Sequence, residues 1–155
     1  MQLEIITPEA KIFDGEVDAV QFPGLDGSFQ VLNNHAAIIS ALVAARTQLK
    51  ANNQTGENYY LLYGATEHKA VPESLKHWNA ILGIHAKVIA IPVDRQGNLD
   101  HAFITKYAPH SLMICTMAVN NETGVYQDLS RLEHTIRHAN PDIFWMVDCV
   151  QAMGK

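Results

Sequence analysis

The stretch that decides the fold is residues 111–148, SLMICTMAVNNETGVYQDLSRLEHTIRHANPDIFWMVD. It begins with the apolar run SLMICTMAV and closes with a second one, IFWMV, each about the length of a strand. Between them, QDLSRLEHTIRHA places Leu129, Leu132 and Ile136 on one face of a helix. Continuous apolar runs are typical of parallel strands that helices cover on both faces. The stretch therefore predicts a strand–helix–strand unit of a parallel sheet.

The same alternation reaches back to about residue 59. The runs YYLLY and AKVIAIPV predict two further strands, and PESLKHWNAIL and LDHAFITKYA predict the helices that follow them. Strand alternating with helix in this way indicates an α/β fold with a parallel sheet over residues 59–155.

The first 43 residues follow a different pattern. LEIITP, KIFDGEVDAVQFPG and GSFQVL are rich in β-branched and aromatic residues, and Asp14-Gly15 and Asp26-Gly27 predict hairpin turns. This pattern predicts antiparallel hairpins that make up half of a β-sandwich. The expected organisation is a partial β-sandwich (residues 1–43), a polar junction (44–58) and an α/β segment (59–155).

Composition excludes several classes of protein. The chain has 155 residues, 17% of them charged, and a net charge of -5, which argues against a nucleic-acid partner. The apolar stretch Ala36–Ala45 contains Ser40 and is too short for direct membrane insertion, and the N-terminus lacks the pattern of a signal peptide. Cys115 and Cys149 lie far apart and predict reduced thiols rather than a disulfide or zinc site. A cytoplasmic protein is expected.

Within residues 1–43, the elements TPE, GEVDAV, PG, DG and NHA occur in an order that resembles the start of the epsilon subunit of rotary ATP synthases. The prolines that this family has on either side of the NHA motif are replaced by Asn33 and Ala37. The resemblance implies a β-sandwich and contacts with the ATP synthase gamma subunit and membrane ring. It also implies membrane association only when docked there. The corresponding function is a rotor-stalk subunit in proton-driven ATP synthesis.

Residues 59–155 resemble cysteine desulfurases and class V aminotransferases. Three motifs carry the likeness: EHKAV at 67–71, AVNNETGV at 118–125 and VDCVQAMGK at 147–155. The resemblance implies part of a three-layer, fold-type I large domain, pyridoxal 5'-phosphate (PLP) as cofactor, and a homodimer formed through this part.

The resemblance also assigns four cofactor-binding residues. Asp148 would keep the pyridine nitrogen of PLP protonated, which the cofactor needs in order to withdraw electrons. Gln151 would donate to the phenolic oxygen, and Asn121 would contact the same oxygen or the substrate. His68 would stack on the cofactor ring.

Other candidate residues are weaker. A phosphate-binding role is not carried over to Thr66, because the EHKAV register places it outside the family's phosphate loop. His134 and His138 lie four residues apart on a helix but lack a third ligand, so no metal site is predicted. Glu122 is interpreted as structural rather than as a general base.

No catalytic residue is predicted. The family needs a Schiff-base lysine beyond the Asp-x-x-Gln motif, and Lys155 matches only the ordinary Gly-Lys pair after that motif. Neither cysteine corresponds to the family's sulfur-accepting cysteine. The expectation is part of a PLP-dependent enzyme, inactive alone, fused to part of an epsilon subunit. Desulfurase or aminotransferase parentage, and a natural or artificial origin of the fusion, both remain open.

Overall fold

The computed structural model describes residues 2–6, 11–16, 19–24, 27–32 and 36–152. The chain divides into two compact units, residues 1–37 and 38–155.

The first unit contains two antiparallel hairpins, which form separate two-stranded sheets. In one, β1 (Gln2–Ile6) pairs with β2 (Lys11–Glu16). In the other, β3 (Ala19–Gly24) pairs with β4 (Gly27–Leu32). The predicted antiparallel hairpins are thus confirmed. The second hairpin reverses between β3 and β4, so Gly27 begins a strand, while Asp26 lies outside the described residues.

The prediction of a turn at Asp14-Gly15 is wrong. Both residues lie inside β2, where Asp14 is opposite Glu4 and Gly15 is opposite Leu3. An Asp-Gly pair makes a hairpin turn only where strand pairing stops, and here the pairing continues to Glu16.

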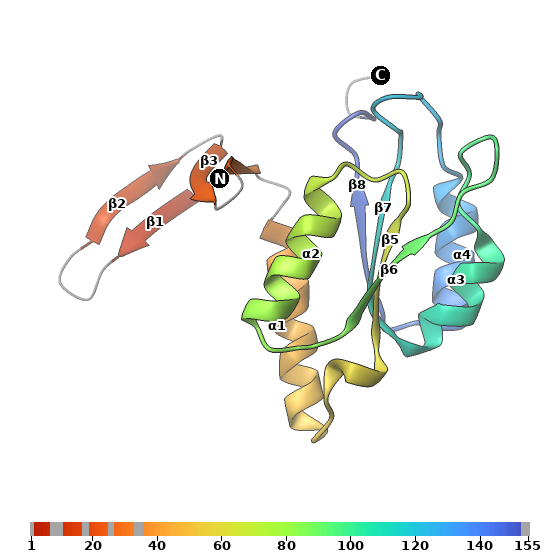
Figure 1. Cartoon of the computed structure of the whole chain (residues 1–155), viewed down its shortest axis with the longest axis horizontal. Coiled ribbons are helices and arrows are strands. Elements are labelled where there is room, and N and C mark those ends of the chain that lie inside the picture. The colour runs from red at the N-terminus through yellow and green to blue at the C-terminus, as the bar shows by residue number, and fades with distance from the viewer. Residues whose placement is uncertain (1, 7–10, 17–18, 25–26, 33–35, 153–155) are drawn as a thin grey trace. The chain divides into compact units, whose positions relative to one another are not determined.

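The second unit is a four-stranded parallel sheet with the strand order β6-β5-β7-β8 and helices on both faces (Figure 1). This confirms the predicted α/β fold. The strands are β5 (Tyr60–Gly64), β6 (Lys87–Ile91), β7 (Ser111–Met117) and β8 (Phe144–Asp148). The helices are α1 (Ala36–Ala51), α2 (Ala70–Ile81), α3 (His101–Tyr107) and α4 (Leu129–Ala139).

Neighbouring residues of β5 show why the strands read as continuous apolar runs. Leu61 and Leu62 point to opposite faces of the sheet, and both are fully buried. Leu61 belongs to a core with Leu42 of α1 and Leu75 of α2, whereas Leu62 belongs to a second core with Leu132 of α4. Figure 1 shows α1 and α2 on one side of the sheet and α3 and α4 on the other. Burying each such leucine stabilises the fold by about 1.5–3 kcal/mol.

Two aspartates begin the helices on the second face. The side chain of Asp100 accepts a hydrogen bond from Phe103 N (3.0 Å) and caps α3. The side chain of Asp128 accepts one from Arg131 N (2.9 Å) and caps α4. Each cap satisfies an otherwise unpaired N–H and contributes about 1 kcal/mol, which explains where these helices start.

Helix α1 runs further than the sequence pattern indicated, to Ala51, and so enters the segment expected to be a polar junction. Leu42 and Leu49 are buried against the sheet, so one face of this helix belongs to the core of the second unit. The helix stops where Asn53 adopts a left-handed backbone with φ of 52°. None of the helices in the described part of the chain is long and apolar enough to cross a membrane.

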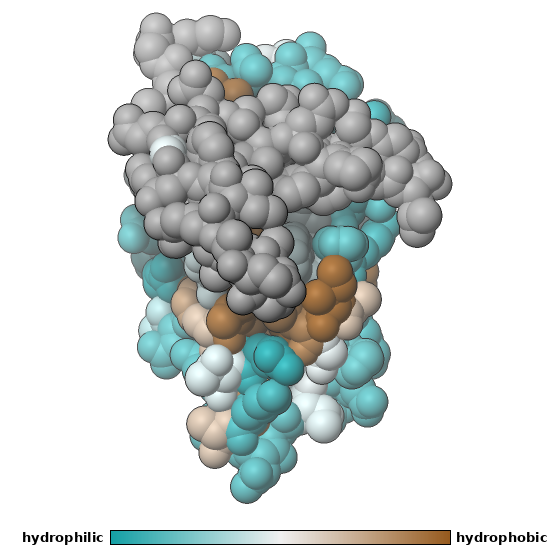
Figure 2. Space-filling model, turned by 90° about the vertical axis from the view of Figure 1, so that its left-hand side faces the viewer, coloured by the Kyte–Doolittle hydropathy of each residue, from teal (hydrophilic) through white to brown (hydrophobic). Residues whose placement is uncertain are grey.

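The side of the molecule that carries α1 and α2 is partly apolar. Figure 2 shows apolar side chains gathered in a band across the middle of this face. Val43 of α1 and Ile81 of α2 are large apolar residues with 44% and 61% exposure, respectively. These two helices therefore do not bury all of their apolar surface within the second unit.

A buried asparagine joins α2 to the sheet. Asn79 Nδ2 donates to Ala86 O (2.9 Å), and Asn79 Oδ1 accepts from Ala86 N (3.0 Å). Asn79 and Ala86 are both buried, so water cannot replace these bonds. These two hydrogen bonds fix the position of the chain between the end of α2 and the start of β6.

We expect Asn79→Ala to lower the free energy of unfolding by about 2–3 kcal/mol, because it leaves a buried N–H and a buried C=O unpaired. Urea unfolding followed by circular dichroism measures this loss. Lys76→Ala is the matched control, since Lys76 is exposed on the same helix and should leave stability nearly unchanged. Equal stability of both variants would contradict the assignment.

Candidate functional site

The carboxyl ends of the strands form the upper edge of the sheet in Figure 1. β7 and β8 end side by side there: Met117 is opposite Asp148, and Ala118 N donates to Asp148 O (2.8 Å). β5 is the other neighbour of β7 and ends at the same edge. The four residues predicted from the sequence all follow these strands: His68 comes after β5, Asn121 after β7, and Asp148 and Gln151 at and after the end of β8.

Asp148 is partly buried at the tip of β8. Its Oδ1 accepts a hydrogen bond from Val150 N (2.9 Å) at the turn that follows the strand. A carboxylate offers about four acceptor positions, so Asp148 can also accept from a protonated ring nitrogen. This residue therefore fits the predicted role beside a pyridine ring.

The other three predicted residues are exposed at this edge and can be reached from solvent. His68 lies just before α2, and its Nδ1 accepts a hydrogen bond from Ala70 N (3.3 Å). A neutral imidazole that accepts at Nδ1 carries its proton on Nε2. Asn121 and Gln151 each present a side-chain amide, which can donate hydrogen bonds to a ligand oxygen.

Glu67 is a feature of this edge that sequence reasoning did not single out. Its Oε1 accepts a hydrogen bond from Met117 N (2.6 Å), while its Oε2 is buried without a hydrogen-bond partner in the described structure. Burial raises the pKa of Glu67 from 4.5 to about 7; the Met117 N–H opposes this rise, and the charge of Asp148 adds to it. The EHKAV motif contains Glu67, but nothing in that motif indicates a buried carboxyl group.

Asn120 is the second missed residue. It is 7% exposed, and its Nδ2 donates to Thr66 O (2.9 Å) in the loop after β5. Its Oδ1 accepts from Glu122 N (3.0 Å) and Thr123 N (2.8 Å), which shapes the turn that carries Asn121. The AVNNETGV motif contains Asn120, but the motif does not show that this asparagine is buried and bonded to a distant loop.

The remaining candidates do not form a metal site. His134 and His138 are exposed on α4, with parallel rings 6.0 Å apart. In the described ranges, no three His, Cys, Asp or Glu side chains come together as metal ligands. Cys115 and Cys149 are free thiols, the first buried and the second partly buried.

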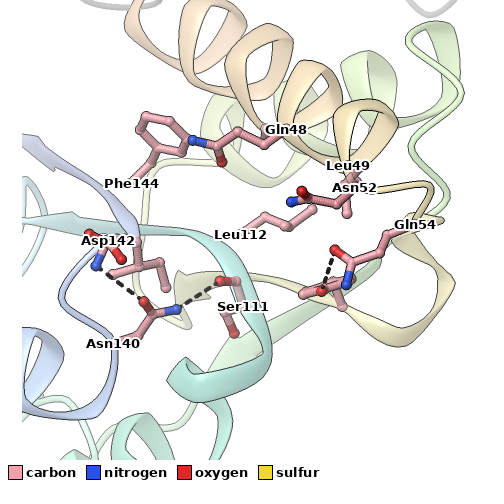
Figure 3. A pocket seen from close by; sticks show the side chains of 12 residues that line it. Gln48, Leu49, Asn52, Gln54, Ser111, Leu112, Asn140, Asp142 and Phe144 are labelled. Carbon is pink, nitrogen blue, oxygen red and sulfur yellow. Dashed lines mark hydrogen bonds between the residues drawn. The ribbon is translucent and has the colours of Figure 1, made fainter.

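Two surface cavities lie elsewhere on the second unit. Figure 3 shows one of about 330 Å³, between the end of α1 and the amino ends of β7 and β8. The other, of about 420 Å³, lies at the starts of α3 and α4 and includes Asp100 and Asp128. None of the four predicted cofactor residues lines either cavity, so the candidate site rests on the strand ends alone. The first cavity is lined by Ala45, Gln48, Leu49, Asn52, Gln54, Tyr59, Ser111, Leu112, Asn140, Asp142, Ile143 and Phe144.

The buried Glu67 predicts a pH dependence of stability. Its pKa is higher in the folded chain (about 7) than in the unfolded one (4.5), so the folded chain binds this proton more tightly. The stabilisation is present below about pH 4.5 and is lost as the pH rises through about 7, by at most about 3 kcal/mol. Urea unfolding between about pH 5 and pH 8, compared with Glu67→Gln, should show this loss only in the wild type. A constant difference between the two proteins would contradict it.

Two family models match the chain. The one described as aminotransferase class-V matches residues 39–155. The one described as the ATP synthase delta/epsilon chain β-sandwich domain matches residues 1–70. An ATP synthase epsilon chain of Chlorobium limicola is 35% identical over 66 residues, which are 43% of this chain and 75% of that protein. One of Campylobacter concisus is 50% identical over 44 residues, 28% of this chain and 34% of that protein.

Solved structures similar to this chain include DndA from Streptomyces lividans, with a TM-score of 0.61 and 25% identity. That match covers 89% of this chain and 34% of DndA. The cysteine desulfurase CsdA from Escherichia coli has a TM-score of 0.55 and 17% identity, over 77% of this chain and 34% of CsdA. The chain thus spans about a third of the length of these proteins. Their fold is the predicted fold-type I arrangement.

Both predicted resemblances are therefore confirmed. The class V match covers most of the chain, and the Chlorobium limicola protein is matched over most of its own length. The chain is a chimera that belongs to the class V aminotransferase family over residues 39–155 and to the ATP synthase epsilon family in its N-terminal part.

Proposed function

We propose that residues 59–155 supply the ring-binding part of the PLP site of a cysteine desulfurase-like or class V aminotransferase enzyme. The observation that carries this proposal is the position of Asp148 at the carboxyl edge of the sheet, next to the end of β7. His68 follows β5 and Asn121 follows β7, so both lie at the same edge of the sheet. Ligands of open α/β sheets bind at this edge.

Each of the four residues then has a role. The Asp148 carboxylate accepts from the ring nitrogen and keeps it protonated, so that bound PLP can serve as an electron sink. Gln151 donates a hydrogen bond to the phenolic oxygen of the ring, and Asn121 contacts that oxygen or the substrate. The exposed His68 covers one face of the ring.

We further propose that these 155 residues do not catalyse the reaction, because Lys155, which lies outside the described residues, matches in sequence the Gly-Lys pair after the Asp-x-x-Gln motif and not the Schiff-base lysine. The family's chemistry, sulfur mobilisation from cysteine or amino-group transfer, would then require residues outside this sequence. The domain arrangement we propose is a partial epsilon sandwich (1–43), a junction (44–58) and a partial large domain (59–155). The two family models overlap at 39–70, which supports a junction within that region.

Incubation with PLP followed by borohydride reduction tests this proposal. We expect no pyridoxyl group on Lys155, and mass spectrometry of the digested chain measures it. Pyridoxamine 5'-phosphate, which has no aldehyde, should bind weakly to the wild type and more weakly to Asp148→Ala. A pyridoxyl group on Lys155 would contradict the proposal that this lysine is not the Schiff-base residue.

The epsilon-like segment supports a second function, that of a rotor-stalk subunit. The support is its match to epsilon chains and its two antiparallel hairpins. The segment would dock on the gamma subunit and the membrane ring of ATP synthase from the cytoplasm. Affinity capture with purified gamma subunit tests this, and absence of capture would contradict the rotor-stalk function. Capture of the chain would favour the rotor-stalk function.

We also propose that the second unit forms a homodimer, as its resemblance implies. The partly apolar face formed by α1 and α2, with Val43 and Ile81 exposed, supports an interface there. Sedimentation equilibrium should give twice the mass of the 155-residue chain, and Val43→Glu should lower it toward the monomer. A monomer at all concentrations would contradict the proposal.

A further inference from the structure

The loops that carry His68 and Asn121 are not held together by the sheet ladder. Pairing between β5 and β7 ends at Tyr63 and Cys115. Beyond it, Ala65 N donates to Ile91 O, so the backbone at the start of the first loop continues to pair with β6 and not with β7. Some other contact must therefore set the distance between the two loops.

Two side chains make that contact, in opposite directions. Glu67, in the loop after β5, accepts a hydrogen bond from Met117 N at the end of β7 (2.6 Å). Asn120, in the loop after β7, donates one to Thr66 O in the loop after β5 (2.9 Å). Each loop thus sends one side chain to the backbone of the other. We call these two bonds the clasp.

Asn120 is also hydrogen-bonded within its own loop, the one after β7. Its backbone N donates to Val125 O (2.9 Å), and its backbone O accepts from Gly124 N (3.0 Å). Its Oδ1 accepts from both the backbone N (2.8 Å) and Oγ1 (2.9 Å) of Thr123. Asn121 is the next residue, so its position depends on the same bonds.

Glu67 is kept at this place at a cost. Its Oε2 is buried and unpaired, and desolvation together with the nearby charge of Asp148 disfavours its ionised form. Met117 N and the buried Cys115 thiol also lie near its carboxyl group. Gly64 makes room for the carboxyl group, because a Cβ there would lie 2.9 Å from Glu67 Oε1. A costly side chain with space left for it is typical of a functional site.

We infer that Glu67 and Asn120 are positioning residues, whose clasp holds His68 and Asn121 at a fixed spacing across the edge where a cofactor ring would lie. Glu67 directly precedes His68 in the sequence. Its carboxyl group accepts the bond from Met117 N, at the end of β7 and opposite Asp148. The Glu67 carboxyl group therefore also fixes the position of His68, which would stack on the ring, relative to Asp148, which would lie beside the ring nitrogen. That this spacing serves to bind a cofactor rests on the proposed function. The two hydrogen bonds of the clasp do not depend on that proposal.

Nuclear magnetic resonance of the 155-residue chain without ligand tests the clasp. The Met117 amide signal should shift with pH around neutrality in the wild type and should not shift in Glu67→Gln. Glu67→Gln keeps the acceptor oxygen, so Met117 N should stay protected from hydrogen exchange. In Glu67→Ala its exchange should be about tenfold faster, the effect of losing one such bond.

The coupling between the two loops is tested by whether a substitution in one loop changes the signals of the other loop. Asn120→Ala should move the His68 signals, and Glu67→Ala should move those of Asn121. Glu122→Gln is the matched control, because Glu122 lies exposed in the same loop, and it should move neither Met117 nor His68. If folded Glu67→Ala leaves the hydrogen exchange of Met117 N and the signals of Asn121 unchanged, the clasp is overturned.

Pyridoxamine 5'-phosphate separates the clasp from the proposed function. We expect it to shift the His68 and Asn121 signals of the wild type and to bind about tenfold more weakly to Glu67→Ala, with Glu67→Gln restoring most of the affinity. No binding to a wild type whose clasp signals behave as expected would overturn the PLP function and leave the clasp standing. Equal binding to wild type and Glu67→Ala would overturn the positioning role.

Discussion

The parallel pairing of β7 with β5 on one side and β8 on the other is the constraint on which the candidate site depends. The register that places Met117 opposite Asp148 brings the ends of β7 and β8 to one level. Since all four strands run in the same direction, every loop that leaves a carboxyl end starts at the same edge. His68, Asn121 and Asp148 come from parts of the sequence up to 80 residues apart, and this pairing brings them to one edge of the sheet.

The sheet can keep that register because both of its faces are covered. α1 and α2 bury one face and α3 and α4 bury the other, which accounts for the apolar character of both alternating sets of strand residues. β7 shows the result most clearly: six of its seven residues are buried. A slip of the register by one residue would move these side chains to the opposite face and disturb the packing of both cores, so the core and the site edge are stabilised together.

Polar groups at the carboxyl edge cost stability that the core offsets. Glu67 has a buried, unpaired oxygen beside another carboxylate, an arrangement that burial and like charge both disfavour. Asn120 is buried as well, but its amide makes hydrogen bonds on both its donor and its acceptor side. Asn120 therefore stabilises its loop, whereas Glu67 stays buried although burial disfavours its charged form.

The sequence by itself determined the elements and the edge. Apolar runs and helical periodicity are local properties, and they were sufficient for the four strands, the parallel sheet and the placement of His68, Asn121, Asp148 and Gln151 at or after strand ends. Motif resemblance added the roles of those four residues, which remain proposals. Only the tertiary structure decided the rest. Burial of Glu67, the two-sided bonding of Asn120, and the continuation of α1 to Ala51 depend on contacts between distant segments, which no local pattern encodes. For the same reason Asp14-Gly15, a turn by local preference, became part of a strand once β1 paired along it.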